Sequence, residues 1–216
     1  METSSVDVVI GMQYGDEGKG KIANQMAASG EYDYVVRFNG GGNAGHTIYL
    51  NGEKIVTHLV PCGILHGIPS VIGNGCVINT QKLFEEIEYL ENLGFNTSLL
   101  KIAENAHIIT MEHIDEDSKD TKIGTTRTGN GPCYRDKVSR TGIRAKDVPE
   151  LKNYLVDMHS LIHSSPKKFL AEGAQGYWLD IDFGDYPYVT SSNTGVGAVL
   201  NNGFNFKQVR NVVGVI

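Results

Sequence analysis

The chain has few cysteines, no long apolar run and no excess of positive charge, and each shortage excludes a class of protein. Cys62, Cys76 and Cys133 lie far apart and form no C-x-x-C pair, so neither a zinc knuckle nor a disulfide framework is expected. No apolar run approaches the ~20 residues of a membrane span. The formal net charge is −6, from 19 Lys and Arg against 25 Asp and Glu, which argues against nucleic acids and membranes as partners.

The N-terminus lacks the basic segment of a signal peptide. Residues 1–5 carry no basic side chain and lead directly into an apolar run. The odd number of cysteines suits a reducing compartment. We therefore expect a soluble protein of the cytoplasm.

Glycine, by contrast, is abundant. It accounts for 26 of the 216 residues, against a usual share of about 7%, while a hydrophobic content of 40% is sufficient for a packed core. The glycines gather after apolar segments, around residues 15–20, 40–45, 124–131 and 173–176. Either the protein is rich in loops, or the glycines lie where the backbone must contact a ligand closely.

Short apolar runs alternate with glycine-rich turns and helical patterns along the chain. Strands are predicted at residues 6–10, 34–38, 99–103, 169–171 and 212–216, the last as a buried strand, and a hairpin at 47–60 around Asn51-Gly52. Helices are predicted at residues 22–28 and 81–93, and from Pro149 through Ile162. Residues 111–144 are polar and glycine-dotted, which predicts a long irregular segment that is either disordered or a lid.

This alternation predicts one α/β domain over residues 1–216, without repeat or linker. A mostly parallel central sheet would carry helices on both faces and a hairpin excursion. The loop after the first strand, residues 11–21, has the composition of a phosphate-binding loop. Its spacing is not that of a Walker A loop, because Gln13 occupies a glycine position and Gly20 the hydroxyl position.

An acidic side chain in such a loop is unexpected, since Asp16 would repel a phosphate. Two roles resolve the conflict: a carboxylate that holds Mg²⁺, or a base beside the reacting group. A tight turn with solvated charges is the alternative without function. Likewise, His46 beside three glycines is either an acid or electrostatic clamp, or a surface histidine at a β-bulge.

Three further loops place hydroxyl and amide donors after strands or turns. They span residues 124–132, 172–176 and 188–194. The first is suited to a phosphate monoester, and its alternative is a flexible loop. The histidines at 58, 66, 107, 113, 159 and 163 show no metal-ligand spacing and are interpreted as structural or surface residues.

Six motifs in order along nearly the whole chain resemble adenylosuccinate synthetase. They are residues 13–21 (QYGDEGKGK), 43–47 (NAGHT), 124–126 (GTT), 136–140 (DKVSR), 172–176 (EGAQG) and 186–194 (YPYVTSSNT). The resemblance implies a ligase that joins L-aspartate to the 6-position of inosine monophosphate and cleaves GTP to GDP and phosphate. It also implies a cytoplasmic homodimer, with a P-loop-like phosphate-binding loop after the first strand.

The resemblance assigns roles to individual residues. Asp16 would remove the N1 proton of the base, so that the 6-oxygen attacks the γ-phosphate of GTP, and His46 would stabilise the moving charge. The catalytic set it implies is Asp16, Lys19, His46 and Gln175. Mg²⁺ would be held by Asp16 and the carbonyl of Gly45. The nucleotide substrate would be held by Lys19, Asn43, Thr126, Gln175 and Thr190, with Arg140 reaching it from the neighbouring subunit. The GTP phosphates would be wrapped by Gly15, Asp16, Glu17, Gly18, Lys19, Gly20, Lys21, Gly45, His46 and Thr47.

The sequence departs from the family pattern at several points. Tyr14 replaces a tryptophan, Gly42 replaces a histidine, and residues 127–130 replace Gly-Arg-Gly-Ile. The stretch between Arg144 and Phe169 is short, as in archaeal members and viral relatives. Some viral relatives act on deoxyguanylate and use ATP; Gly42 keeps that alternative open, whereas Asp16 favours inosinate.

The family continues beyond Ile216, into segments that bind aspartate and select guanine. The sequence therefore matches the N-terminal part of a single such domain, and we expect little or no ligase activity from these 216 residues alone. Besides the ligase that acts on inosinate and the enzyme that acts on deoxyguanylate, the third hypothesis is a nucleotide-binding module without catalysis.

Overall fold

Strands and helices alternate along the chain in the computed structural model, which describes residues 3–50, 52–121 and 123–216. The strands are β1 (Ser5–Gly11), β2 (Tyr34–Arg37), β3 (His46–Leu50), β4 (Glu53–Thr57), β5 (Ser70–Ile72), β6 (Val77–Ile78), β7 (Leu100–Ala103), β8 (His107–Ile108), β9 (Leu155–Val156), β10 (Lys168–Glu172) and β11 (Val209–Val215). The α-helices are α1 (Lys19–Ala27), α2 (Thr80–Asn92), α3 (Met111–Ser118), α4 (Asn130–Ser139), α5 (Met158–His163) and α6 (Gly197–Leu200). Short 3₁₀ helices occupy Cys62–His66, Thr97–Leu99, Ala145–Asp147, Pro149–Tyr154, Tyr177–Leu179 and Phe206–Gln208.

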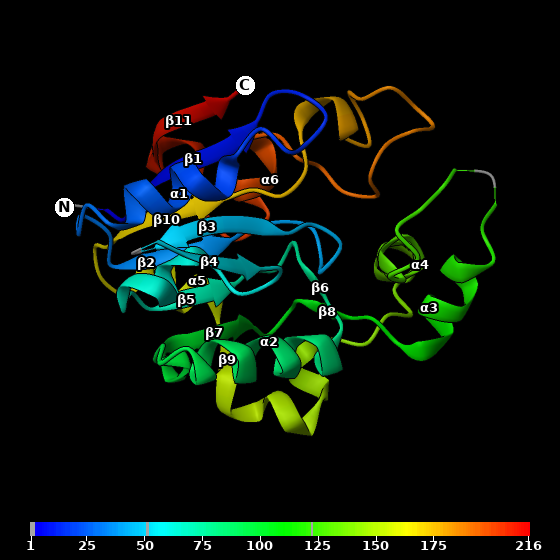
Figure 1. Cartoon of the computed structure of the whole chain (residues 1–216), viewed down its shortest axis with the longest axis horizontal. Coiled ribbons are helices and arrows are strands. Elements are labelled where there is room, and N and C mark those ends of the chain that lie inside the picture. Colours follow the sequence, from blue (N-terminus) through cyan, green and yellow to red (C-terminus); the bar gives the residue numbers. More distant parts are fainter. Residues whose placement is uncertain (1–2, 51, 122) are drawn as a thin grey trace.

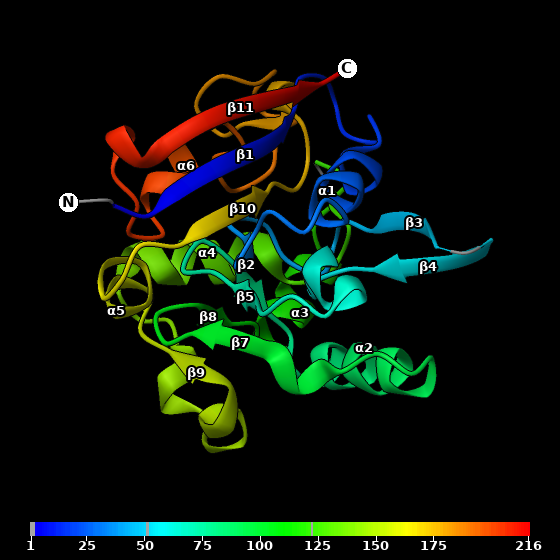
Figure 2. The same ribbon diagram turned by 90° about the vertical axis from the view of Figure 1, so that its left-hand side faces the viewer.

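The central sheet has seven strands in the order β11-β1-β10-β2-β5-β7-β9, and every neighbouring pair is parallel. Figure 2 shows these strands one below another, from β11 at the top to β9 at the bottom. The predicted parallel α/β sheet is thereby confirmed. The last strand forms as predicted, but it is an edge strand paired only with β1 and not a buried one. Val212 is 47% exposed for that reason.

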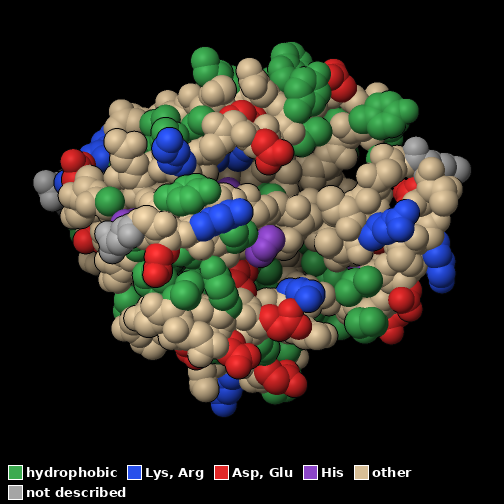
Figure 3. Space-filling model, viewed as in Figure 1, with side chains coloured by type: hydrophobic (Ala, Val, Ile, Leu, Met, Phe, Trp, Pro, Cys, Tyr) green, Lys and Arg blue, Asp and Glu red, His purple; other side chains and the backbone are tan. Residues whose placement is uncertain are grey.

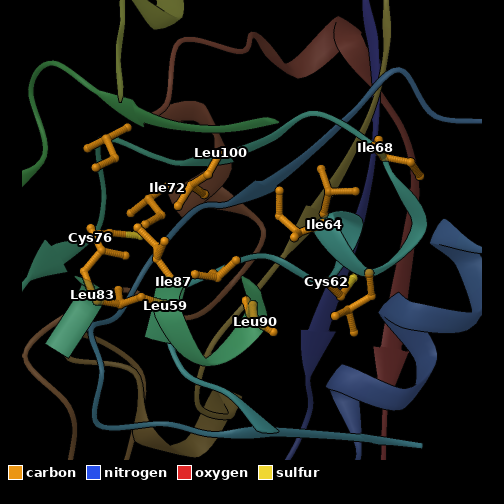
Figure 4. Packing of buried hydrophobic residues seen from close by; sticks show 14 of the residues in the cluster. Leu59, Cys62, Ile64, Ile68, Ile72, Cys76, Leu83, Ile87, Leu90 and Leu100 are labelled. Carbon is orange, nitrogen blue, oxygen red and sulfur yellow. The ribbon is translucent and has the colours of Figure 1, made fainter. Parts of the chain in front are cut away.

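Helices cover both faces of the sheet, as the sequence predicts. On one face, Val9 of β1 belongs to a cluster with Ala23 of α1 and Leu83 of α2. On the other, Val8 belongs to a cluster with Met158 of α5 and Val199 of α6. Successive residues of a strand point to opposite faces, so β1 contributes to both cores, through Val6, Val8 and Ile10 on one face and Val9 on the other. Figure 4 shows the first cluster, whose labelled members come from β5, β7, α2, the segment 59–68 and Cys76, which directly precedes β6.

The predicted hairpin is formed by β3 and β4, in antiparallel register from His46 opposite Thr57 to Leu50 opposite Glu53. Asn51 of the predicted turn lies outside the described residues, while Gly52 has the positive φ of 87° that such a turn requires. The hairpin projects beyond the sheet (Figure 2) and lies against α1.

The segment from 111 to 144 is not the irregular stretch that the sequence predicts. In its described residues it contains α3 and α4, which form the lobe at the right of Figure 1. Thr110 begins α3 with a capping box, in which its hydroxyl accepts from the N–H of His113. Gly129, with φ 79°, begins α4. Cys133 and Tyr134 of α4 then pack with Val77 and Ile109, which holds this polar lobe against the chain.

The single helix predicted from Pro149 through Ile162 is also wrong. The chain forms a 3₁₀ helix, then β9, then α5. Leu155 and Val156 pair with Ile102 and Ala103 on the open edge of β7, so the backbone hydrogen bonds of the sheet prevail over the helical pattern. Asp157 starts the second helix by accepting two backbone N–H bonds.

Candidate active site

A cavity of about 540 Å³ lies where the loops after three strands of the sheet meet. β1 and β2 are not neighbours in the sheet, because β10 lies between them. After β10 the chain crosses to β11, which lies on the opposite side of β1. Such a reversal of strand order opens a crevice at the carboxyl ends of the strands, the usual ligand site of a parallel α/β sheet. Figure 3 shows this side of the molecule, where the surface is hollowed beside the α3–α4 lobe. The cavity is lined by Tyr14, Gly15, Asp16, Gly18, Lys19, Gly20, Asn43, Ala44, Gly45, His46, Thr47, Thr126, Gln175 and Leu179.

Glu17 braces the loop after β1 from within. One of its carboxylate oxygens accepts from the backbone N–H groups of Gln13 and Gly15, both at 3.0 Å, and the other accepts from Lys19. Burial alone would raise the pKa of this carboxyl, but the bond from Lys19 and the backbone bonds lower it below its usual value. The side chain thus stays charged while fully covered, and it shapes the loop without lining the cavity.

Asp16 and Gln175 line the cavity from strained positions. Both have a φ of 59°, a left-handed conformation that is uncommon for residues other than glycine. The Gln175 side chain is 8% exposed and donates to Asn43 at 3.3 Å, while its own oxygen has no partner among the described residues. Strain and unpaired polar atoms of this kind concentrate at ligand sites.

His46 enters the cavity from the first residue of β3, with only 5% of its surface exposed. Gly20 of α1 makes this approach feasible, because a Cβ on residue 20 would lie 2.6 Å from the Cβ of His46. Burial lowers the pKa of the imidazole well below its usual value, and the nearby cations Arg37 and Lys19 lower it further. The ring is therefore neutral at physiological pH, with one N–H and one acceptor nitrogen.

Most of the predicted site residues are brought together in this one cavity, and four are not. Gly15, Asp16, Gly18, Lys19, Gly20, Asn43, Gly45, His46, Thr47, Thr126 and Gln175 line it, whereas Glu17, Lys21, Arg140 and Thr190 do not. Thr190 is hydrogen-bonded to a residue that lines the cavity, because its backbone N–H donates to the carbonyl of Leu179 at 2.8 Å. Arg140 is exposed at the C-terminal end of α4.

Two buried charges beneath the cavity escaped the sequence analysis. Arg37 ends β2 and Glu172 ends β10, and they form an ion pair beside His46. Glu172 appears in the sequence only as part of a motif, and Arg37 not at all. The available signal is a charge at the carboxyl end of an otherwise apolar strand, as in the sequence YVVR.

A second cavity, of about 770 Å³, lies beside Gly42, the residue that precedes Asn43. Gly42 lines it together with Leu59, Ile109, Arg127 and Asn130, among others. A Cβ on residue 42 would meet only the Leu59 side chain, at 4.0 Å. Because Gly42 has no side chain, open space remains at this position.

Oxygen donors suited to Mg²⁺ are present at the first cavity. The described residues contain no group of three or more His, Cys, Asp or Glu side chains that would hold a metal ion. A carboxylate on Asp16 and a backbone carbonyl at Gly45 both line the cavity, however. One or two carboxylates completed by phosphate oxygens and water is the usual environment of Mg²⁺, so these residues fit that ion.

The described part of the chain includes no helix that is both long and apolar enough to cross a membrane. All three cysteines are buried and unbridged.

Comparison with known proteins identifies the family. The sequence model described as Adenylosuccinate synthetase matches residues 8–154 and 148–216. This chain belongs to the adenylosuccinate synthetase family. Among curated adenylosuccinate synthetases, that of Thermodesulfovibrio yellowstonii is 39% identical over 98% of this chain and 62% of its own length. That of Chlorobium chlorochromatii is 41% identical over 96% of this chain and 60% of its own length. The chain thus spans about three fifths of these members of the family.

Solved structures that share this fold include an adenylosuccinate synthetase and a related phage enzyme. The fully ligated adenylosuccinate synthetase of Plasmodium falciparum has a TM-score of 0.85 and 38% identity, and the match covers 99% of this chain and 62% of that one. The succinoaminodeoxyadenylate synthetase of cyanophage S-2L, bound to dGMP and dATP, has a TM-score of 0.83 and 26% identity. That match covers 100% of this chain and 65% of the phage protein.

Proposed function

We propose that this chain carries the phosphoryl-transfer site of an adenylosuccinate synthetase. The reaction joins L-aspartate to the 6-position of inosine monophosphate, with cleavage of GTP to GDP and phosphate. The observation that carries the proposal is the single cavity that unites the glycine loop after β1 with Asp16, His46 and Gln175. Family membership supports it.

Each reacting group has a matching side chain at the cavity. Asp16, whose carboxylate is exposed there, removes the N1 proton of the base, which places negative charge on the 6-oxygen. That oxygen attacks the γ-phosphorus, and the bond to the β–γ bridging oxygen breaks. His46 and Lys19 donate to the phosphate oxygens, and Gln175 donates to the 6-oxygen. The aspartate amine then displaces phosphate from carbon 6 and loses a proton.

The loop residues would hold the GTP phosphates together with a magnesium ion. The N–H groups around Gly15 and Gly18 precede the N-terminus of α1, which is a favourable position for anions. Asp16 and the carbonyl of Gly45 would hold Mg²⁺, whose chemistry is to neutralise charge that develops on the phosphates. Glu17 supports this loop from beneath, and Lys21 follows within α1.

The nucleotide monophosphate would be held by Asn43, Thr126 and Thr190 on one protomer and by Arg140 of a second copy. Arg140 is exposed and does not line its own cavity, which agrees with a role in a homodimer. We further propose that the enzyme acts in the cytoplasm, with GTP, aspartate and the nucleotide as partners, and without nucleic acid or membrane. Residues 1–216 would then form part of a single domain.

Deoxyguanylate is the second candidate acceptor, with ATP or GTP as the donor. The phage structure bound to dGMP and dATP has this fold, and Gly42, where a side chain would meet only Leu59, directly precedes Asn43 of the cavity. Inosinate is favoured because the identity to adenylosuccinate synthetases is higher, at 39% against 26%, and because Asp16 occupies the loop.

Two measurements on the purified chain test the proposal. Isotope exchange in GTP labelled at the β–γ bridge reports phosphoryl transfer without aspartate, because the label moves to a non-bridging position whenever the transfer reverses. We expect exchange that depends on inosinate. The same exchange assay then identifies the acceptor and the donor without ligation to aspartate, by comparing inosinate with deoxyguanylate and GTP with ATP. Nucleotide binding without exchange for any pair would instead identify a binding module without catalysis.

A further inference from the structure

The buried hydroxyl of Tyr134, in α4, is hydrogen-bonded to two backbone segments. The side chain is 8% exposed and does not line the first cavity. Its oxygen accepts from the N–H of Gly40 at 3.1 Å, and its O–H donates to the carbonyl of Gly75 at 2.8 Å. Burial raises the pKa of this hydroxyl, whereas Ser192 and the Gly40 N–H lower it less, so the group keeps the hydrogen that it donates.

The hydroxyl joins the loops that follow two neighbouring strands of the sheet. Gly40 lies after β2 and Gly75 after β5, and these strands pair in parallel. Buried backbone groups of a loop need partners, because no sheet ladder supplies them. The N–H of Gly40 finds its partner in Tyr134, while the carbonyl of Gly40 accepts from the N–H of Val77 at 3.0 Å. Both polar backbone groups of Gly40 are thus fixed from outside its own loop.

Gly40 in turn lies against the side chain of Gln175. It has a φ of 83°, which favours glycine, and a Cβ at this position would lie 2.8 Å from Ala174 Cβ and 3.0 Å from Gln175 Nε2. The same Nε2 donates to Asn43 Oδ1 at 3.3 Å. Gln175 and Asn43 both line the first cavity. The backbone that Tyr134 holds therefore supports two polar side chains of the cavity.

The amide of Gln175 depends on this support. Its oxygen has no hydrogen-bond partner among the described residues, and its bond to Asn43 is long. A side chain that is held by one weak hydrogen bond keeps its orientation largely through packing. Contact with Gly40 provides that packing, so a displacement of Gly40 would let the amide turn.

Three residues of α4 contact the same two loops. Asn130 lies against Gly41, where a Cβ would be 2.7 Å from Asn130 Oδ1, and Lys137 Nζ donates to the carbonyl of Asn74 at 2.9 Å. Asn130, Tyr134 and Lys137 are spaced i, i+4 and i+7, so they lie on one face of the helix. Figure 1 shows α4 beside β6, the strand that follows the second of these loops. The helix is therefore fixed relative to the loops that it supports.

We propose that Tyr134 is a positioning residue for the nucleotide monophosphate. Its hydroxyl fixes Gly40, and Gly40 keeps the amide of Gln175, with its partner Asn43, in the orientation that receives the substrate. This inference rests on the proposed function, in which Gln175 and Asn43 bind that nucleotide. It makes the α3–α4 lobe a working part of the site.

The first test reads the amide of Gln175 directly by nuclear magnetic resonance. In ¹⁵N-labelled protein, Tyr134→Phe, which removes only the hydroxyl oxygen, should shift the backbone signal of Gly40 and the side-chain amide signals of Gln175. Tyr32→Phe is the matched control and should leave both unchanged. Tyr32 is 9% exposed and donates to Asp7 at 2.8 Å, and neither of these residues lines the cavity.

A measurement on the unsubstituted protein covers the case in which Tyr134→Phe does not fold. Because coupling between two sites is reciprocal, a nucleotide that binds Gln175 must also act on the groups that hold it. Inosinate should therefore shift the ring signals of Tyr134, whereas it should leave those of Tyr32 in place. Bound inosinate with unchanged Tyr134 signals would overturn the proposal.

The second test measures nucleotide binding by calorimetry. Tyr134→Phe should weaken inosinate binding about tenfold, the factor that one unpaired buried backbone group can cost, and should leave GTP binding nearly unchanged. Tyr32→Phe should change neither. In a Gln175→Ala background, Tyr134→Phe should cause no further loss, because the hydroxyl acts through Gln175. A merely structural role would weaken the binding of both nucleotides, or give the same loss in both backgrounds.

The outcomes separate this inference from the proposed function. Unchanged Gln175 signals in Tyr134→Phe, equal losses for inosinate and GTP, or equal losses in both backgrounds would overturn the positioning role, even if the chain exchanges label well. If the signals shift as expected but the unsubstituted chain binds neither inosinate nor deoxyguanylate, the positioning of Gln175 stands and the proposed function fails.

Discussion

Replacing Gly20 by alanine should separate α1 from the hairpin that carries His46. The new Cβ would lie 2.6 Å from His46 Cβ, 2.8 Å from Cγ and 3.2 Å from the backbone Cα. Ordinary carbon contacts are about 3.5–4.0 Å, so the two elements must move apart by about 1 Å. Alanine stabilises a helix by about 1 kcal/mol over glycine, whereas overpacking costs about 1–3 kcal/mol, so we expect a net loss of about 1 kcal/mol.

The effect on function should be larger than the effect on stability. A displacement of about 1 Å at a catalytic group can reduce the rate by ~10²-fold, so isotope exchange should fall strongly in a protein that remains folded at 25 °C. Gly197→Ala is the matched control, because it starts α6 and a Cβ there would meet nothing within 4 Å. That variant should be as stable as the parent or slightly more stable. Urea unfolding and the exchange assay check both. Equal stability and equal exchange in Gly20→Ala would refute the reasoning from this contact.

Two further predictions concern groups outside the cavity. Glu86 is buried and accepts from the backbone N–H groups of His58, Leu59 and Val60 at 2.7, 3.0 and 3.2 Å. Glu86→Gln should therefore lower the free energy of unfolding by about 2 kcal/mol. The control is Glu85→Gln at an exposed position, which should change the free energy of unfolding by less than about 0.5 kcal/mol. A loss in Glu86→Gln no greater than that control would contradict the assignment. Burial, together with the charges of Lys137 and Arg144, lowers the pKa of His107 to about 4 from 6.5. The unfolded chain therefore takes up a proton on this group below pH 6.5 while the folded one does not, and stability is lost as the pH falls from 6.5 to 4, by up to about 3 kcal/mol. Urea unfolding between pH 7 and 4.5 should show a shallower decline in His107→Asn than in the parent; parallel curves would show that His107 does not titrate in this way.

Local sequence patterns were sufficient to predict a helix or strand whose conformation depends mainly on its own residues. The helix at 81–93 was readable from its apolar spacing and from Gly94, and α2 with a φ of 88° at Gly94 agrees to within one residue. Where tertiary pairing competes, the pattern misleads. Leu155 has helical spacing, but the open edge of β7 offers it backbone hydrogen bonds. The lobe of α3 and α4 was missed because its helices are short and polar, and caps together with a small cluster of apolar contacts hold them in place.

The candidate site divides in the same way. Asp16, His46 and Gln175 were found because glycine-rich loops after strands are visible in the sequence. Arg37 and Glu172 were not, because their contact depends on the register of two strands that are about 135 residues apart in the chain. Non-local pairing of this kind has no local signal apart from a charge in an apolar strand.

The central claim is that the cavity transfers a phosphoryl group to a nucleotide whose proton Asp16 removes. The most direct test is isotope exchange in labelled GTP with Mg²⁺ and inosinate, comparing the chain with Asp16→Asn, which keeps the shape and removes the base. A base of this kind contributes roughly 10²–10⁴-fold, so exchange should require inosinate and fall by at least that factor in the variant. Exchange that proceeds without inosinate, or at the same rate in Asp16→Asn, would contradict it.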